Sequence, residues 1–69
     1  MESKYIVTGM TCGHCVKSVT EEVSEIEGVN DVQVTLDGGQ MVVTSEAPVA
    51  FESIEEAVKE AGNYTVAAA

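Results

Sequence analysis

The chain has 69 residues, 45% of them hydrophobic and 22% charged, a composition typical of one small globular domain spanning residues 1–69. Three lysines stand against 12 acidic residues, for a net charge of −9. Because no basic patch can form, this balance excludes nucleic-acid binding and binding to anionic membrane surfaces. It favours a positively charged protein partner or cations.

The N-terminal residues predict neither a signal peptide nor a membrane anchor. Residues 1–5 lack a basic region followed by an apolar stretch. The apolar runs are far shorter than the roughly 20 residues that span a bilayer. We therefore expect no membrane insertion and a cytoplasmic location, where the two cysteines are normally reduced.

The first half of the chain predicts a strand, a loop, a helix and a second strand. Residues 4–8 are apolar and β-branched, as in a strand, and residues 9–15 form a loop with two glycines. A helical period begins at Cys15 and is terminated by Gly28. Its apolar stripe is made of Val16, Val19, Val23 and Ile26. Residues 31–37 then alternate in polarity, with Val32, Val34 and Leu36 expected on the buried face.

The second half repeats this order. Asp37, Gly38 and Gly39 indicate a hairpin turn into a return strand over residues 41–44. A second helix carries an apolar stripe made of Ile54, Ala57, Val58 and Ala61. Gly62 and Asn63 end it, and residues 64–66 predict a short last strand. The order β-α-β-β-α-β predicts an α+β, ferredoxin-like fold, with a four-stranded antiparallel sheet and both helices on one face.

The chemistry of the chain is concentrated at Cys12-Gly13-His14-Cys15. The pair lies between a strand and a helix, where helix amides and the charge of Lys17 are expected to stabilise thiolate. Thiolates are soft ligands that select Cu(I) and also accept zinc and its heavier relatives. A structural zinc site needs four ligands, whereas Cys12, Cys15 and His14 are the whole cysteine and histidine inventory. The residues therefore favour an open two-thiolate site.

In the segment Gly9-Met10-Thr11-Cys12-Gly13-His14-Cys15, the sequence resembles the heavy-metal-associated domains, and most of all the small bacterial copper chaperones of that family. The resemblance extends over nearly the whole chain. It implies the ferredoxin-like fold and Cu(I) bound by Cys12 and Cys15. It also implies delivery of copper to a copper-transporting P-type ATPase.

The resemblance assigns supporting roles to residues around the two cysteines. Met10 matches a family methionine that packs under the loop, and Gly13 lies within the motif. Thr11 stands where zinc-type relatives tend to carry Asp, which favours copper. Tyr64 follows the late glycine one position later than the usual tyrosine, because Asn63 intervenes.

Three other residues near Cys12 and Cys15 each have two possible roles. His14 either joins the coordination, within one chain or across a metal-bridged homodimer, or tunes the thiolates from solvent. Lys17 lowers a thiolate pKa or is simply solvated. Tyr64 is a neighbour of the loop or an aromatic at the edge of the core.

We expect a cytosolic Cu(I) chaperone that binds and transfers its metal without catalysis. Three alternatives stay open: a carrier for Zn, Cd or Hg with the same fold, the N-terminal metal-binding domain of a transporter, and a dithiol redox protein. The redox alternative is disfavoured, because the chain has no Trp and its one proline, Pro48, is not placed like the active-site proline of thioredoxin-like folds.

Overall fold

The computed structural model describes residues 1–69 and places four strands and two helices in the order β-α-β-β-α-β. The elements are β1 (Glu2–Thr8), α1 (Gly13–Ser24), β2 (Val29–Val34), η1 (Asp37–Gly39, a 3-10 turn), β3 (Gln40–Ser45), α2 (Phe51–Ala61) and β4 (Thr65–Ala68). The predicted α+β, ferredoxin-like fold is confirmed.

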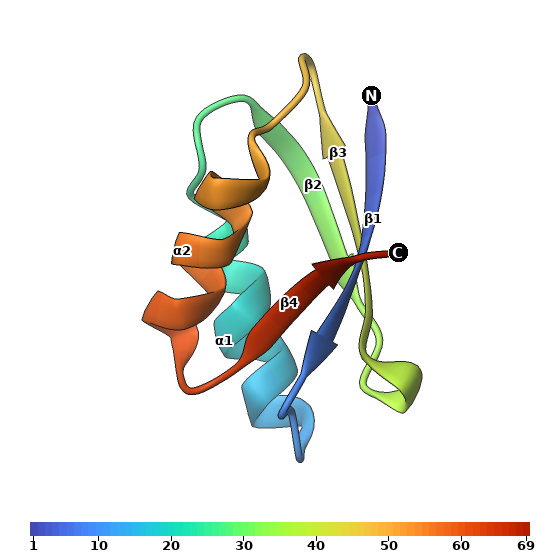
Figure 1. Cartoon of the computed structure of the whole chain (residues 1–69), viewed down its shortest axis with the longest axis vertical. Helices are drawn as coiled ribbons and strands as arrows, with labels where there is room; N and C mark the ends of the chain where they lie inside the picture. Colours follow the sequence, from blue (N-terminus) through green and yellow to red (C-terminus); the bar gives the residue numbers. More distant parts are fainter.

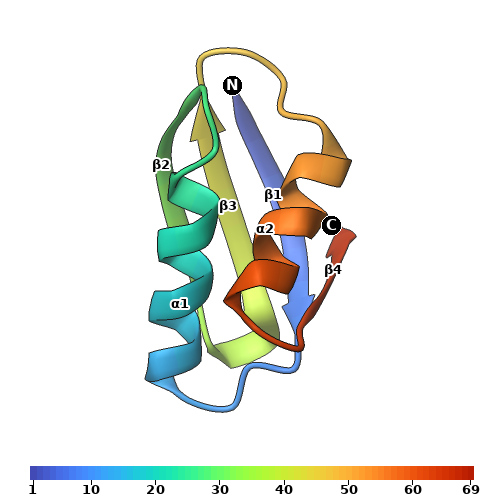
Figure 2. The same ribbon diagram turned by 90° about the vertical axis from the view of Figure 1, so that its left-hand side faces the viewer.

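The four strands form one antiparallel sheet in the order β2-β3-β1-β4. Strand β1 lies inside the sheet, where Lys4 faces Val42 of β3 and Val7 faces Val66 of β4. Figures 1 and 2 show both helices packed against one face of this sheet. The two βαβ units are interleaved, because β3 lies between β1 and β2 while β1 lies between β3 and β4.

The hydrophobic core lies between the helices and the sheet. Because side chains alternate along a strand and recur every three to four residues along a helix, each element contributes one apolar row. The nine buried core residues are Tyr5, Val7, Val19, Val23, Val32, Met41, Val43, Ile54 and Val58. Partly buried side chains, Met10 and Tyr64 among them, pack against this cluster. The core therefore extends to the loops that follow β1 and α2.

Four details of the predicted elements are wrong. Leu36 does not face the core: β2 ends at Val34, and Leu36 turns into η1 with 42% of its surface exposed. Helix α1 begins at Gly13, two residues before the predicted start at Cys15, because Cys12 is already its N-cap. The same helix ends at Ser24, so Ile26 packs against the core from the following turn. Tyr64 precedes β4, which begins at Thr65.

Two connections meet at one end of the molecule. The loop from β1 to α1 and the loop from α2 to β4 lie together at the lower end in Figures 1 and 2. Their backbones are in contact, since a Cβ added at Gly9 would lie 3.3 Å from the carbonyl oxygen of Asn63. This end carries both cysteines. Neither helix of the structure has the length and apolar character needed to cross a bilayer.

Candidate metal centre

The two cysteines form a pair of free thiols at the start of α1. Their Sγ atoms are 3.7 Å apart, and no disulfide joins them. Cys12 is exposed, whereas Cys15 is partly buried. The pair is therefore accessible from solvent, and Cys12 is the more exposed of the two residues.

The backbone around Cys12 explains how the two sulfurs meet. Cys12 is extended, with φ −159° and ψ 171°, and its carbonyl oxygen accepts the N–H of Cys15 at 3.1 Å. This first helical turn brings residues three apart to the same side. Upstream, Gly9 has a φ of +107°, a conformation that favours glycine, and it reverses the chain after β1. The loop thus presents both thiols beside the helix N-terminus.

The pKa of the Cys15 thiol is lowered from its ordinary value of 9.0 to about 6. The largest cause is a hydrogen bond from the backbone N–H of Thr11, followed by one from the Tyr64 hydroxyl and one from the Thr11 hydroxyl, whose oxygen is 3.8 Å from Sγ. Partial burial acts in the opposite direction, and Cys12 adds a small lowering. Cys15 is therefore a thiolate at neutral pH, ready to bind a soft metal.

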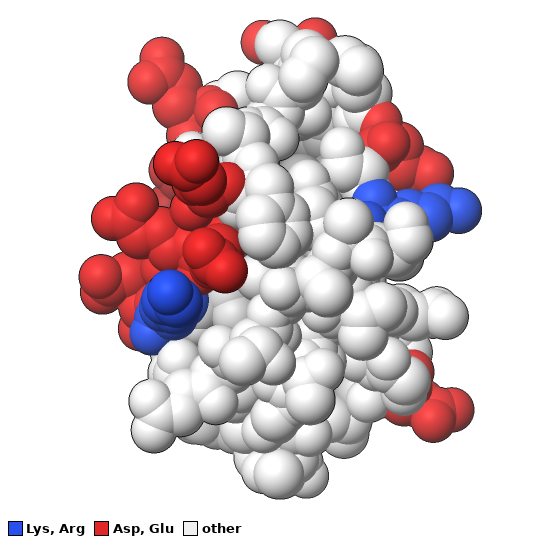
Figure 3. Space-filling view, in the orientation of Figure 1, with Lys and Arg blue, Asp and Glu red and all other residues white.

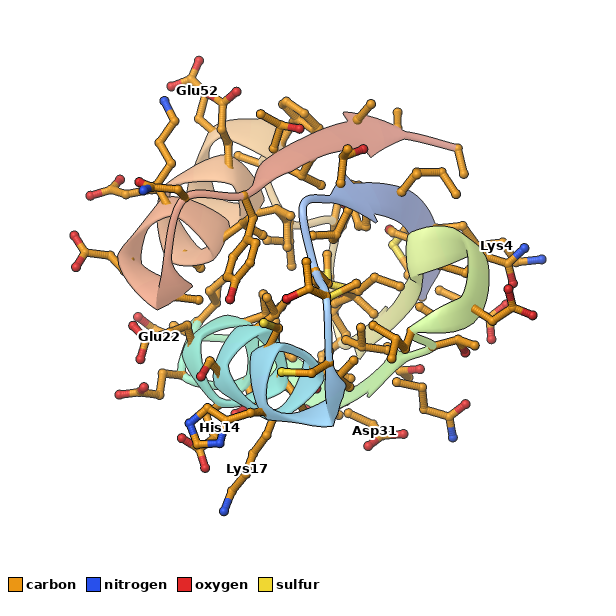
Figure 4. All side chains as sticks on the ribbon, turned by 90° about the horizontal axis from the view of Figure 1, so that it is seen from below. Lys4, His14, Lys17, Glu22, Asp31 and Glu52 are labelled. Carbon is orange, nitrogen blue, oxygen red and sulfur yellow. The ribbon has the colours of Figure 1, made fainter.

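The causes of the lowered pKa of Cys15 come from residues outside α1, chiefly Thr11 and Tyr64. Lys17 is exposed, and Figure 4 shows it projecting outward from α1. The principal donor, Thr11, lies upstream of α1, and its residue type alone indicates only the kind of metal. A threonine next to a cysteine gives no sequence signal for such a bond.

His14 also projects from the outer side of α1, next to Lys17 (Figure 4), and is exposed. The structure gathers no three side chains of the His, Cys, Asp and Glu types into a group that could hold a metal ion. Within one chain, therefore, His14 and the two thiols are not brought together around a common point. This placement suits the solvent-facing interpretation of His14.

Tyr64 lies over the loop despite the extra residue before it. A Cβ at Gly9 would meet Cδ1 of its ring at 3.4 Å. Interaction with the Tyr64 hydroxyl is among the causes that lower the pKa of Cys15, and interaction with Cys15 is in turn the largest cause of a raised pKa of the Tyr64 hydroxyl, ahead of burial. Tyr64 is thus a neighbour of the thiolate, and its ring also packs against the core.

Two further motif residues have separate places in the structure. Met10 is partly buried and packs against the core, beneath the loop. Gly13 is the first residue of α1, and a Cβ built on it would meet nothing within 4 Å. Its φ is not positive, whereas Gly9 has a φ of +107°.

The geometry suits one soft metal ion held by two sulfurs. A metal–sulfur bond of about 2.3 Å lets one ion bridge two sulfurs that are up to roughly twice that distance apart. The observed 3.7 Å lies within this range. With no third protein ligand at hand, the site matches the low coordination number that Cu(I) tolerates better than the four ligands of structural zinc.

A strongly acidic surface lies over the two helices, away from the lower end that carries the cysteines (Figure 3). Figure 3 shows the red side chains gathered on the helical side. A shallow groove between α1 and α2 is walled by Glu22, Glu25, Glu56 and Glu60 and floored by Ile26 and Ala57. Burial, together with the charges of Glu25, Glu60 and Glu21, raises the pKa of Glu22. Glu22 is half-buried.

Comparisons with known proteins point in one direction. The family model described as "Heavy-metal-associated domain" matches residues 4–64. The "Copper chaperone CopZ" of Bacillus subtilis is 42% identical over 69 residues, which cover 97% of this chain and 99% of that protein. A solved structure of a "CopZ metallochaperone" superimposes with a TM-score of 0.86 at 31% identity, covering 97% of this chain and all of that one.

A longer protein also contains a similar segment. A "Probable copper-exporting P-type ATPase" of Archaeoglobus fulgidus is 38% identical over 63 residues, which cover 90% of this chain but 8% of that protein. The same fold therefore occurs both as a chain of this length and as a small part of a much longer one.

Proposed function

The chain belongs to the heavy-metal-associated domain family, and we propose that it is a cytosolic Cu(I) chaperone. In this proposal Cys12 and Cys15 bind one Cu(I) ion, which passes by ligand exchange to a copper-transporting P-type ATPase. The protein catalyses no reaction. The names of its relatives, which include copper chaperones, support copper as the metal.

The observation that carries the proposal is the open pair of thiols. Cys12 and Cys15 lie 3.7 Å apart, and no third His, Cys, Asp or Glu side chain joins them. A two-coordinate ion leaves room for a thiolate of the partner to bind as a third ligand. One of the original sulfurs can then dissociate, so the metal is transferred to the partner protein without being released to water. A closed four-ligand site would lack this route.

The acidic surface over the helices supports a positively charged partner. The groove between α1 and α2 has four glutamates on its walls, and the chain carries a net charge of −9. Complementary charge raises the rate at which partners meet and is screened by salt. The partner proposed here is therefore a metal-binding domain of the ATPase that presents lysines or arginines around its own cysteines.

A second candidate function is favoured by one comparison. Because 90% of the chain matches 8% of a copper-exporting ATPase, the same fold serves as a domain of a transporter. In that role the chain would receive copper instead of delivering it. The chemistry of Cys12 and Cys15 is the same in both cases, and the direction of transfer distinguishes them.

The test is a transfer experiment without oxygen. The reduced, Cu(I)-loaded protein is mixed with the metal-free N-terminal domain of a copper-transporting ATPase. The two are separated by charge, and copper is measured in each. We expect copper to reach the domain at a rate that falls with added salt, and Cys12→Ser and Cys15→Ser to abolish loading. Lys17→Gln, on the same helix but outside the thiol pair, serves as the control.

Retention of all copper by the wild-type protein, in the presence of an acceptor that binds Cu(I) from a chelator, would contradict the chaperone function. Transfer that proceeds only from the domain to this protein would favour the transporter-domain role. Loading that survives in either serine variant would overturn the two-thiolate site.

A further inference from the structure

The sheet has two edge strands, β2 and β4, which differ in how they are protected. Edge strands are commonly blocked by charged side chains, prolines or bulges, because their free N–H and C=O groups can pair with another chain. Strand β2 carries Asp31, and its register to β3 is interrupted between Val29 and Asp31. Strand β4 (Thr65–Ala68) has no charged residue and no proline, and its register to β1 is regular. β4 is therefore the open edge of the sheet.

The register of β4 shows which of its backbone groups are free. The N–H of Ala69 donates to the carbonyl oxygen of Lys4 on β1, at 3.1 Å. Hydrogen-bonded and non-hydrogen-bonded positions alternate along an antiparallel pair, so the backbone of Ala67 also faces β1. Val66 and Ala68 occupy the alternate positions. They therefore direct their N–H and C=O groups away from β1, toward the open side.

The face of the molecule around β4 is uncharged, although the chain carries a net charge of −9. In Figure 3, where β4 faces the viewer, white atoms extend between the two ends and the charged side chains lie mainly along the two sides. Phe51, the first residue of α2, adds an aromatic side chain that is 39% exposed. Its ring lies 6.1 Å from the ring of Tyr5, which is opposite Ala68. An acidic chain can approach this face without the repulsion that it meets over the helices.

We propose that β4 is a docking edge for a second copy of this chain, with the two β4 strands paired in antiparallel orientation so that two sheets join into one. About a twofold axis at Ala67, Val66 of each copy lies opposite Ala68 of the other, and each such pair exchanges two N–H···O bonds. Ala67 then faces Ala67 of the second copy in a non-hydrogen-bonded pair, where strands come closest and a small side chain fits. The edge is thus self-complementary, and Phe51 adds apolar surface beside it from both copies.

Both thiol pairs stay free in such a dimer. β4 begins directly after the α2–β4 loop, at the end of the molecule that carries the cysteines. Antiparallel pairing therefore directs the two thiol pairs toward opposite ends of the joined sheet. The dimer differs from one bridged by metal at the cysteines, and it does not depend on copper transfer.

The shortness of β4 limits the strength of the pairing. The strand has 4 residues, so the interface is far smaller than the roughly 1,200 Å² of stable complexes, and we expect a dissociation constant of about 0.1–1 mM. The repulsion between two acidic chains is screened by salt. Raising the salt from about 0.1 M to about 1 M, which shortens the Debye length from roughly 10 to 3 Å, should therefore strengthen the dimer. Copper transfer to a basic partner has the opposite salt dependence.

The experiment is sedimentation equilibrium of the reduced, metal-free protein at both salt concentrations, over protein concentrations that span the expected dissociation constant. Amide NMR spectra are recorded on the same samples. We expect a monomer–dimer equilibrium that high salt favours. The amide signals of Val66 and Ala68 should shift with protein concentration, and those of α1 should not.

Two variants of equal net charge test whether the dimer forms through β4. Ala67→Glu places two carboxylates opposite each other on the twofold axis and should weaken the dimer by about fivefold. Gln33→Glu adds the same charge at an exposed residue of the other edge strand and should leave the dimer close to wild type. Ala68→Pro removes an outward N–H without taking a bond from β1, and it should also weaken the dimer. If Ala68→Pro does not fold, the matched glutamate variants decide.

Three results would overturn the proposal. The first is a wild-type protein that stays monomeric throughout at both salt concentrations. The second is a dimer that Ala67→Glu and Gln33→Glu weaken equally, or whose concentration-dependent shifts lie outside β4. The third is a monomer whose Val66 and Ala68 amides shift only when an uncharged extended peptide of another sequence is added, which would assign the edge to a different protein. None of these results bears on Cu(I) binding, so the two proposals fail separately.

Discussion

The ionisation of Cys15 gives the most direct quantitative prediction about the site. With a pKa of about 6, about 90% of this thiol is ionised at neutral pH, against roughly 1% for a thiol with a pKa of 9. Removing the donors one at a time raises this pKa. Tyr64→Phe removes the second-largest cause and Thr11→Val the third, while the backbone N–H of Thr11, the largest cause, is kept in both. Each variant should therefore stop short of the ordinary value.

The assay is the rate of Cys15 alkylation as a function of pH, resolved from Cys12 by peptide mass spectrometry. The midpoint for the wild-type protein should lie near 6, and the midpoints of both variants should be higher but below 9. A Lys17→Gln control should keep the wild-type midpoint, because that lysine is not among the causes of the shift. A wild-type midpoint near 9, or variants with unchanged midpoints, would refute the account of the hydrogen bonds.

Two other predictions concern the stability of the scaffold. In Gly39→Ala the new Cβ would lie 2.1 Å from the carbonyl oxygen of Val7 at a φ of +66°, so we expect a loss of about 2–5 kcal/mol in urea denaturation. Gly38→Ala, with a similar φ but open space, should cost only about 1–2 kcal/mol, and equal losses would contradict the contact. Since burial and neighbouring charges raise the pKa of Glu22, its ionisation destabilises the folded state above that pKa, and stability is regained as pH falls through it. Glu22→Gln should therefore raise the melting temperature at neutral pH, and by less in high salt, whereas Glu27→Gln at an exposed position should not.

Most of the fold could be predicted because its signals are local and periodic. The valines of α1 and the alternation around Val32 indicate which faces are buried, and the structure places Val19, Val23 and Val32 in the core. Leu36 was misplaced for a physical reason. Alternation continues in the sequence past Val34, but the chain has already turned into η1, and only the tertiary structure decides where a strand stops.

The closeness of the two cysteines was predictable, but their surroundings were not. The sequence predicts an open pair of thiols at Cys12 and Cys15, and the structure places their sulfurs 3.7 Å apart. The donors to Cys15 come from Thr11 and from Tyr64, which is far away in the sequence. Such interactions depend on how the β1–α1 loop packs against the α2–β4 loop, and no sequence pattern within either loop predicts that packing.

The position of the Tyr64 side chain also could not be predicted from the sequence. Because Asn63 separates Tyr64 from Gly62, the sequence leaves open whether the ring lies above the metal loop. The bond from the N–H of Tyr64 to the carbonyl oxygen of Gly62 closes a tight turn with Asn63 exposed at the surface. The ring of Tyr64 packs against the core after this turn, and that packing depends on the tertiary structure.

The proposed two-thiolate site for Cu(I) at Cys12 and Cys15 can be tested by metal titration. The reduced, metal-free protein is titrated with Cu(I), without oxygen, against a coloured Cu(I) chelator, and the titration is repeated with Zn(II). We expect tight binding of Cu(I), far weaker binding of Zn(II), and loss of Cu(I) binding in Cys12→Ser and Cys15→Ser but not in Lys17→Gln. Zn(II) binding of equal strength, or Cu(I) binding that survives in either serine variant, would contradict it.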